Sequence, residues 1–215
     1  MRTEGIHARV RRGLAAGVAL LLLGAAALTF WYQDWQYNLP TPRPPGLNAP
    51  PTGVRLALAG WAPQKDPRPL FLHFFNPQCP CSRFNLAHIR ELLRSHGQRA
   101  RFVAVLQGDD SRAAQASFDS LGLDMEALPD PHGRLAAVCG VYSTPQAVIV
   151  DPAGRLYWRG NYNASRYCTN RRTEFARLAL ESVLERGAMP QLPPPATIAY
   201  GCPLPRDRRR TEVSR

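Results

Sequence analysis

Residues 69–83, PLFLHFFNPQCPCSR, join an apolar run to two closely spaced cysteines. Only His73 interrupts the run 69–75, which is typical of a strand buried on both faces of a sheet. Apolar residues then recur at helical spacing over 82–96, and Gly97 suits the end of a helix. The sequence therefore predicts that the two cysteines lie where a buried strand turns into a helix.

This position suits Cys79 and Cys81 to redox chemistry. Unpaired N–H groups and a partial positive charge at a helix N-terminus favour a thiolate over a thiol. Arg83 adds a cation nearby, and a lowered thiol pKa makes a cysteine nucleophilic. We predict a pKa for Cys79 below the value of about 8.5 for free cysteine. Metal binding by the sulfur pair, or inert packing, are the alternatives.

Strands and helices alternate through the rest of the body. Strands are predicted at 69–75, 101–106, 147–150 and 156–158, and helices at 82–96, 111–121, 132–139 and 173–186. Ser111 is expected to cap the second helix, and Asp151-Pro-Ala-Gly154 suits a hairpin turn between the last two strands. This order predicts an α/β fold with a mixed sheet and helices on both faces.

Three segments resemble thioredoxin-like redoxins. Residues 74–79, FFNPQC, resemble the thioredoxin approach to its nucleophile. Residues 139–160, CGVYSTPQAVIVDPAGRLYWRG, resemble the redoxin half that carries a cis-proline and a hairpin. Residues 200–204, YGCPL, are similar to a C-terminal Gly-Cys element of redoxins of the alkyl hydroperoxide reductase–thiol-specific antioxidant type. The resemblance covers about 68–203 and implies a thioredoxin-like fold, thiol–disulfide chemistry, and no cofactor or metal.

The resemblance also implies roles for individual residues. Thr144 and Pro145, joined by a cis peptide bond, are expected to hold the backbone of a substrate. His73 stands where thioredoxins keep a buried acid, so it is expected to relay a proton with a pKa near neutrality; the alternative is a strand histidine bonded to a backbone carbonyl. Ser82 stands where thioredoxin has its second cysteine, whereas Cys81 comes one residue earlier.

Two departures from the family pattern bear on activity. A disulfide between Cys79 and Cys81 closes a small ring, which we expect to be strained and easily reduced. Peroxiredoxins place Thr or Ser three residues before their reactive cysteine, and Asn76 occupies that position here. A thiol peroxidase variant is therefore less favoured than disulfide exchange.

Three further cysteines have other expected roles. Cys139 is predicted to pack in the core. Cys168 and Cys202 flank the last helix, so a structural disulfide between them would tie the tail to the domain. Connectivity does not follow from sequence, and this pairing stays a candidate.

The N-terminal region predicts an anchor. Residues 14–32 carry no charge and make a helix of about 28 Å, close to the hydrocarbon thickness of a bilayer. Arg9, Arg11 and Arg12 precede it, which predicts a cytoplasmic N-terminus and an exported body. A signal peptide cleaved after Ala25-Ala26-Ala27 is the alternative.

The predicted organisation has five parts. They are a basic N-terminus at 1–13, a transmembrane anchor at 14–32, a proline-rich spacer at 33–67, the thioredoxin-like domain at 68–189 and an extended tail at 190–215. The formal net charge of the 215 residues is +11, and arginines concentrate at both ends. Because no basic stripe interleaved with aromatics runs through the body, nucleic-acid binding is not expected.

Together these features predict a thiol–disulfide oxidoreductase in the bacterial inner membrane, with one span and its domain facing the periplasm. Cys79 attacks a substrate disulfide, and Cys81 or an outside thiol releases the product. Expected partners are protein thiols or disulfides, a small thiol or a peroxide. The alternatives are a thiol peroxidase and a copper chaperone that binds Cu(I) through Cys79 and Cys81.

Overall fold

The computed structural model describes residues 3–35, 39–61, 66–165 and 169–204. The chain forms two units, 1–39 and 40–215, which are considered separately. The first unit holds helix α1 (Thr3–Phe30) and the π-helical turn η1 (Trp31–Trp35). Within it, Arg9–Gln33 is long and apolar enough to cross a membrane.

The second unit is built on a five-stranded mixed sheet in the order β3-β2-β1-β5-β6. Its strands are β1 (Leu70–Phe75), β2 (Arg101–Leu106), β3 (Glu126–Pro129), β5 (Gln146–Val150) and β6 (Leu156–Gly160). Central β1 runs parallel to β2 and antiparallel to β5. The strands β2 and β3 are parallel, and β5 and β6 form an antiparallel hairpin. A small second sheet pairs β4 (Ser143–Thr144) with β7 (Cys202–Pro203).

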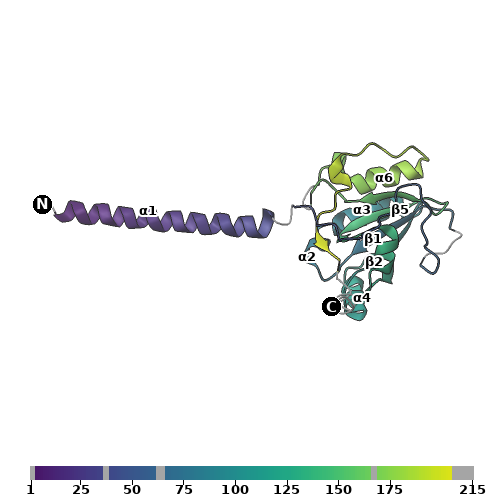
Figure 1. Cartoon of the computed structure of the whole chain (residues 1–215), viewed down its shortest axis with the longest axis horizontal. Coiled ribbons are helices and arrows are strands. Elements are labelled where there is room, and N and C mark those ends of the chain that lie inside the picture. The colour runs from purple at the N-terminus through teal and green to yellow at the C-terminus, as the bar shows by residue number, and fades with distance from the viewer. Residues whose placement is uncertain (1–2, 36–38, 62–65, 166–168, 205–215) are drawn as a thin grey trace. The chain divides into compact units, whose positions relative to one another are not determined.

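Helices cover both faces of the large sheet (Figure 1). The described helices of this unit are α2 (Pro80–Arg83), α3 (Leu86–His96), α4 (Ser111–Asp119), α5 (Arg134–Cys139), α6 (Phe175–Leu184), η3 (Arg171–Thr173) and η4 (Pro194–Ala196). Because successive strand side chains point to opposite faces, Phe71 meets α3 and α6 whereas Leu72 meets α5. The mixed sheet with helices on both faces is as predicted, and the fold is thioredoxin-like.

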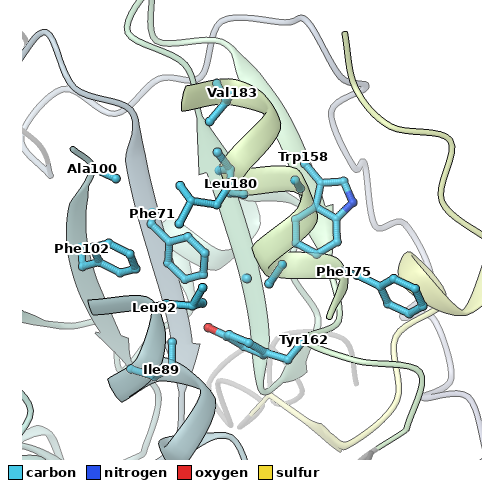
Figure 2. Close-up of a cluster of buried hydrophobic side chains, with 14 of the residues drawn as sticks. Phe71, Ile89, Leu92, Ala100, Phe102, Trp158, Tyr162, Phe175, Leu180 and Val183 are labelled. Atoms are coloured by element: carbon cyan, nitrogen blue, oxygen red, sulfur yellow. The ribbon is translucent and has the colours of Figure 1, made fainter. Parts of the chain in front are cut away.

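The core on the α3–α6 face is rich in aromatic side chains (Figure 2). Phe71 stacks on Phe102 with 4.8 Å between ring centroids. Trp158 and Phe175 close the other side of the cluster, and Tyr162 lies beneath it with its ring wholly buried. This cluster fixes α3 and α6 on the sheet and therefore fixes the loops at their ends.

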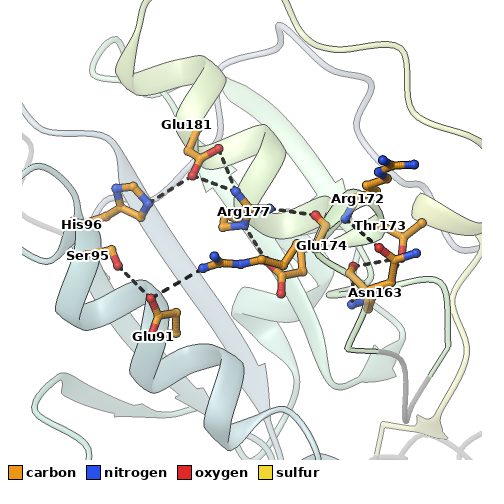
Figure 3. A network of polar contacts seen from close by, with 11 residues as sticks. Glu91, Ser95, His96, Asn163, Arg172, Thr173, Glu174, Arg177 and Glu181 are labelled. Atoms are coloured by element: carbon orange, nitrogen blue, oxygen red, sulfur yellow. Dashed lines mark hydrogen bonds and ion pairs between the residues drawn. The ribbon is translucent and has the colours of Figure 1, made fainter.

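A polar network ties α6 to its neighbours on the same face (Figure 3). Arg177 donates to Glu174, to both carboxylate oxygens of Glu181 at 3.1 and 3.2 Å, and to the backbone oxygen of Arg171 at 2.7 Å. The Nε2 atom of His96 in α3 lies 3.6 Å from Glu181. The network joins the start of α6 to its middle and to α3.

Several local expectations need correction. The helix predicted over 82–96 is divided into α2 and α3, because the backbone of Asn85 has ψ near 0° and leaves the helical path. Phe84, one of the apolar residues in the predicted range 82–96, is exposed between these two helices. Asp110, not Ser111, caps α4: its carboxylate accepts from the backbone N–H groups of Arg112 and Ala113.

The proline-rich segment is not a spacer along its whole length. The backbone at 53–56 pairs beside β6, through bonds of 2.7 Å from Gly53 N to Leu156 O and 2.8 Å from Leu156 N to Val54 O. Leu56 is buried in the core on the α5 face. The compact unit therefore begins at Pro40, not at residue 68, because this segment satisfies the exposed edge of β6.

The tail is also only partly extended. Ala196 and Ala199 are fully buried, and the backbone N–H of Asn161 donates to Ala196 O at 2.8 Å. Residues 190–204 thus pack on the domain. The segment 205–215 lies outside the described residues.

Candidate functional site

Cys79 lies just beyond the C-terminal end of the central strand β1. Its backbone N–H donates to Asn76 O at 3.1 Å, and the Asn76 side chain accepts from Gln78 N at 3.0 Å. These bonds close a turn that places Cys79 immediately before α2, in an extended conformation (φ −85°, ψ 122°). Pro80 follows as the first helical residue, where its missing N–H costs nothing. The thiol is half-buried.

Ser82 supports this turn from inside. It is fully buried, its hydroxyl accepts from Asn76 N at 3.3 Å, and its own N–H donates to Cys79 O at 3.1 Å. The hydroxyl thus holds the loop that carries Cys79. A direct catalytic role for Ser82 stays a prediction. Cys81 belongs to α2, and its side chain lies outside the described part of the chain.

Cys202 is the unexpected member of the site. Its Sγ atom lies 3.2 Å from the Sγ atom of Cys79, although 123 positions separate them in sequence. The pairing of β4 with β7, in which Thr144 faces Cys202, carries the tail to this place. Cys168, the partner expected for Cys202, lies outside the described residues, so that disulfide stays a prediction.

Thr144 lies opposite Cys202 in the small sheet, and Pro145 follows it. Their peptide bond is cis, as predicted. Ser143 and Thr144 are buried, and their strand is paired with the protein's own tail. Their expected role in holding a substrate backbone stays a prediction. In this structure the backbone of Ser143 and Thr144 pairs with residues 202–203 of the same chain.

His73 points from β1 into the α3–α6 face. It is fully buried, and its Nδ1 atom lies 2.5 Å from the Tyr162 hydroxyl rather than beside a backbone carbonyl. Burial, with a smaller contribution from His88, lowers the pKa of His73 to about 3, not near neutrality. Burial also lowers the pKa of His88 and raises that of Tyr162 well above its usual value. His73 is therefore neutral at ordinary pH, and its role as a proton relay stays a prediction.

Cys139 is separate from this site. It is fully buried in the core on the α5 face, as predicted, and burial raises the pKa of its thiol to about 12. It is therefore an inert thiol at physiological pH.

A cavity elsewhere in the domain and possible metal ligands were the other candidates for a functional site. A cavity of about 320 Å³ is lined by Leu70 and by residues of the 151–154 turn, at the opposite end of β1 from Cys79. In the part of the chain that the structure describes, no three His, Cys, Asp or Glu side chains gather as metal ligands.

The strand order, the cysteine after β1 and the cis-proline before β5 define a thioredoxin-like thiol-bearing domain. Residues 56–203 match the model of a domain of unknown function, DUF6436. Because the match spans more than half of the chain, the protein belongs to this family. No curated protein matches it.

Solved structures share this fold. A hypothetical protein from Sinorhizobium meliloti 1021 is 20% identical, with a TM-score of 0.60, over 75% of this chain and 97% of that one. An uncharacterized conserved protein from Geobacillus kaustophilus is 21% identical, with a TM-score of 0.59, over 79% and 95%. A thioredoxin-like protein in its oxidized form is 14% identical, with a TM-score of 0.48, over 66% and 99%. At such identities the first two establish the fold alone.

Proposed function

We propose that this protein is a membrane-tethered thiol–disulfide oxidoreductase with Cys79 as its nucleophile. The observation that carries the proposal is the contact of 3.2 Å between the sulfur atoms of Cys79 and Cys202 at the C-terminal end of β1. Two sulfur atoms this close, both half-buried, are arranged for disulfide exchange rather than for packing alone. The hydrogen-bonded turn at 76–79 holds the nucleophile in place before a substrate arrives.

The first chemical step is attack by the Cys79 thiolate on a substrate disulfide. One new S–S bond joins Cys79 to the substrate, and the other substrate sulfur leaves as a thiolate. A second thiol then attacks Cys79, releases the substrate in its reduced form and leaves an oxidised protein. A dithiol reductant restores the starting state. The same cycle run backward oxidises a substrate dithiol.

The full chain in detergent tests this activity directly. We expect it to accelerate reduction of insulin disulfides by dithiothreitol, because Cys79 relays the electrons, and we expect Cys79→Ser to abolish the acceleration. Cys168→Ser is the matched control, since Cys168 is a cysteine outside the three segments that carry the thioredoxin-like resemblance. Equal acceleration by wild type and Cys79→Ser would contradict the proposal.

Tethering rests on the uncharged span 14–32 of the N-terminal unit and on Arg9, Arg11 and Arg12, which precede that span. We propose that α1 stays uncleaved in a bacterial inner membrane, with residues 40–215 on the periplasmic side. Mass spectrometry of the membrane fraction should then detect peptides from within 1–32. A mature protein that begins at Leu28 would instead show that the segment is a cleaved signal.

A further inference from the structure

We propose that Cys202 is the thiol that resolves Cys79, and that the tail 195–203 is built to present it. The inference rests on the proposed function, because it takes Cys79 as the nucleophile. Cys202, in the C-terminal segment, would then release the substrate from Cys79, a step that the sequence analysis gave to Cys81 or to an outside thiol.

The Cys202 sulfur lies within reach of the Cys79 sulfur. The sulfur atoms of Cys79 and Cys202 are 3.2 Å apart, and a disulfide requires about 2.05 Å. A small rotation of either half-buried side chain can therefore bring the two atoms to bonding distance. At this separation the Cys202 thiol is an intramolecular reactant at high effective concentration.

Specific hydrogen bonds hold the tail on one side of the site. Thr41 N donates to Ala199 O at 2.8 Å, and the Thr41 hydroxyl donates to Gly201 O at 3.2 Å. The Ser143 hydroxyl donates to Tyr200 O at 3.2 Å. These bonds fix the backbone on both sides of residue 200, immediately before Cys202.

Further anchors hold the tail upstream. The Asn161 side chain donates to Pro195 O at 2.8 Å and to Ile198 O at 2.6 Å, and the Tyr200 hydroxyl donates to Asn163 O at 2.8 Å. A Cβ atom on Gly160 would lie 2.0 Å from Ala196 O, so only glycine allows the tail to pack this closely on β6. A segment needed only as a connector does not require such anchoring.

Gly201 allows the tail backbone to approach β4 more closely than any other residue would. Its φ of +122° is disfavoured for other residues, and a Cβ there would lie 2.4 Å from Thr144 O. The glycine lets the tail lie directly against β4. That close approach is what places the next residue, Cys202, beside Cys79.

In the mixed disulfide, the Cys202 thiolate attacks the Cys79 sulfur. The Cys79–Cys202 bond forms as the bond between Cys79 and the substrate sulfur breaks, and the substrate sulfur leaves with the electron pair and takes a proton from water. The protein loses two electrons and the original substrate disulfide gains them. An external dithiol then reduces the Cys79–Cys202 bond.

A small aromatic disulfide, 5,5′-dithiobis(2-nitrobenzoate), tests the step on the reduced full chain in detergent. Attack by Cys79 releases one coloured thiolate, and resolution releases a second from the same reagent molecule. With one equivalent of reagent we expect wild type and Cys81→Ser to release two thiolates, and Cys202→Ser to stop at one and retain the adduct on Cys79. Cys168→Ser should behave as wild type.

Trypsin separates the candidate bonds after reaction, with free thiols blocked. Cys79 and Cys81 share the peptide 66–83, because Pro69 protects the bond after Arg68, whereas Cys168 lies in 167–171 and Cys202 in 187–206. In Cys81→Ser we expect a cross-link between 66–83 and 187–206, which then identifies Cys79–Cys202. Gly201→Val should slow the second release at least about tenfold without slowing the first, since it displaces the tail. Gly122→Ala, at another positive φ but in open space, is its control.

Each other outcome overturns the inference. If Cys202→Ser releases two thiolates and Cys81→Ser stops at one, then Cys81 is the resolving thiol. A cross-link between 167–171 and 187–206 in the active, reagent-treated protein would make Cys202 structural. If Cys79→Ser reacts as wild type, the proposed function itself fails, which distinguishes that failure from the loss of the Cys202 step alone.

Discussion

The Tyr162 hydroxyl lies 2.5 Å from Nδ1 of His73, and both side chains are fully buried. Their rings meet edge to face with 5.3 Å between centroids, and His88 meets the same tyrosine ring at 5.6 Å. Among the described residues, Nε2 of His73 has no hydrogen-bond partner. Burial withholds the solvent that would stabilise a charged ring, and no carboxylate pairs with it among the contacts described, so the fold keeps His73 neutral.

This arrangement predicts an acid-labile fold. The pKa of His73 is about 3 in the folded chain and about 6.5 when unfolded. Between these values the unfolded chain binds a proton that the folded chain does not, so the free energy of unfolding falls as pH decreases from about 6.5 to about 3. We expect His73→Gln to remove much of this slope, on the order of several kcal/mol across the interval, in denaturant unfolding followed by tryptophan fluorescence.

The control is His132→Gln, which changes an exposed histidine in the turn before α5. It measures the effect of removing a histidine side chain that lies outside the core. His88 and His96 also have pKa values lowered by burial, so some slope will remain in His73→Gln. If the slope of His73→Gln equals that of wild type, His73 is not the group that titrates.

Asp130 predicts a second large effect on stability. It is buried, and its carboxylate accepts from Leu135 N at 3.2 Å, Ala136 N at 3.0 Å and the Gln107 side chain at 2.9 Å. Replacement by alanine leaves three donors unsatisfied inside the protein. We expect Asp130→Ala to lower the free energy of unfolding by about 3 kcal/mol, against about 1 kcal/mol for Asp110→Ala at the exposed cap of α4. Equal losses would contradict this account.

Arg177 predicts a third effect on the stability of the fold. Its side chain is 19% exposed and bonds two carboxylates and a backbone oxygen, so its removal leaves partly buried charges without a cation. We expect Arg177→Met to cost about 1–2 kcal/mol. Arg94→Met is the matched control, because Arg94 is 74% exposed where it pairs with Glu91, and it should cost less than about 0.5 kcal/mol. Denaturant unfolding at two salt concentrations measures both.

Sequence predicted the parts of this fold that depend on local pattern. The apolar runs at 69–75 and 101–106 became β1 and β2, and the Asp151–Gly154 turn became the β5–β6 hairpin, in which Gly154 has φ of +78°. The cis bond before Pro145 followed from the family resemblance. Such features are set by neighbouring residues and need no knowledge of distant contacts.

The missed features all depend on long-range contacts. The strand β3 has four residues and no alternating pattern, and it is defined by its pairing with β2. The tail strand β7 has two residues, and only its pairing with β4 brings Cys202 to Cys79. The signal that was present in sequence was the dipeptide Gly201-Cys202, since a glycine before a cysteine allows the close approach to Thr144 that the structure shows.

The contact between Cys79 and Cys202 makes a final prediction about reactivity. A thiol 3.2 Å away can donate its proton to a Cys79 thiolate, and a hydrogen bond to the charged form lowers a pKa. We expect Cys79 to have a pKa below about 8.5, and Cys202→Ala to raise it by about one pH unit because the donor is lost. Cys202→Ser keeps a donor and should restore much of the difference. The pH dependence of alkylation of peptide 66–83, in a Cys81→Ser background, measures the pKa of Cys79 alone, and identical values in all three proteins would show that Cys202 does not stabilise the thiolate.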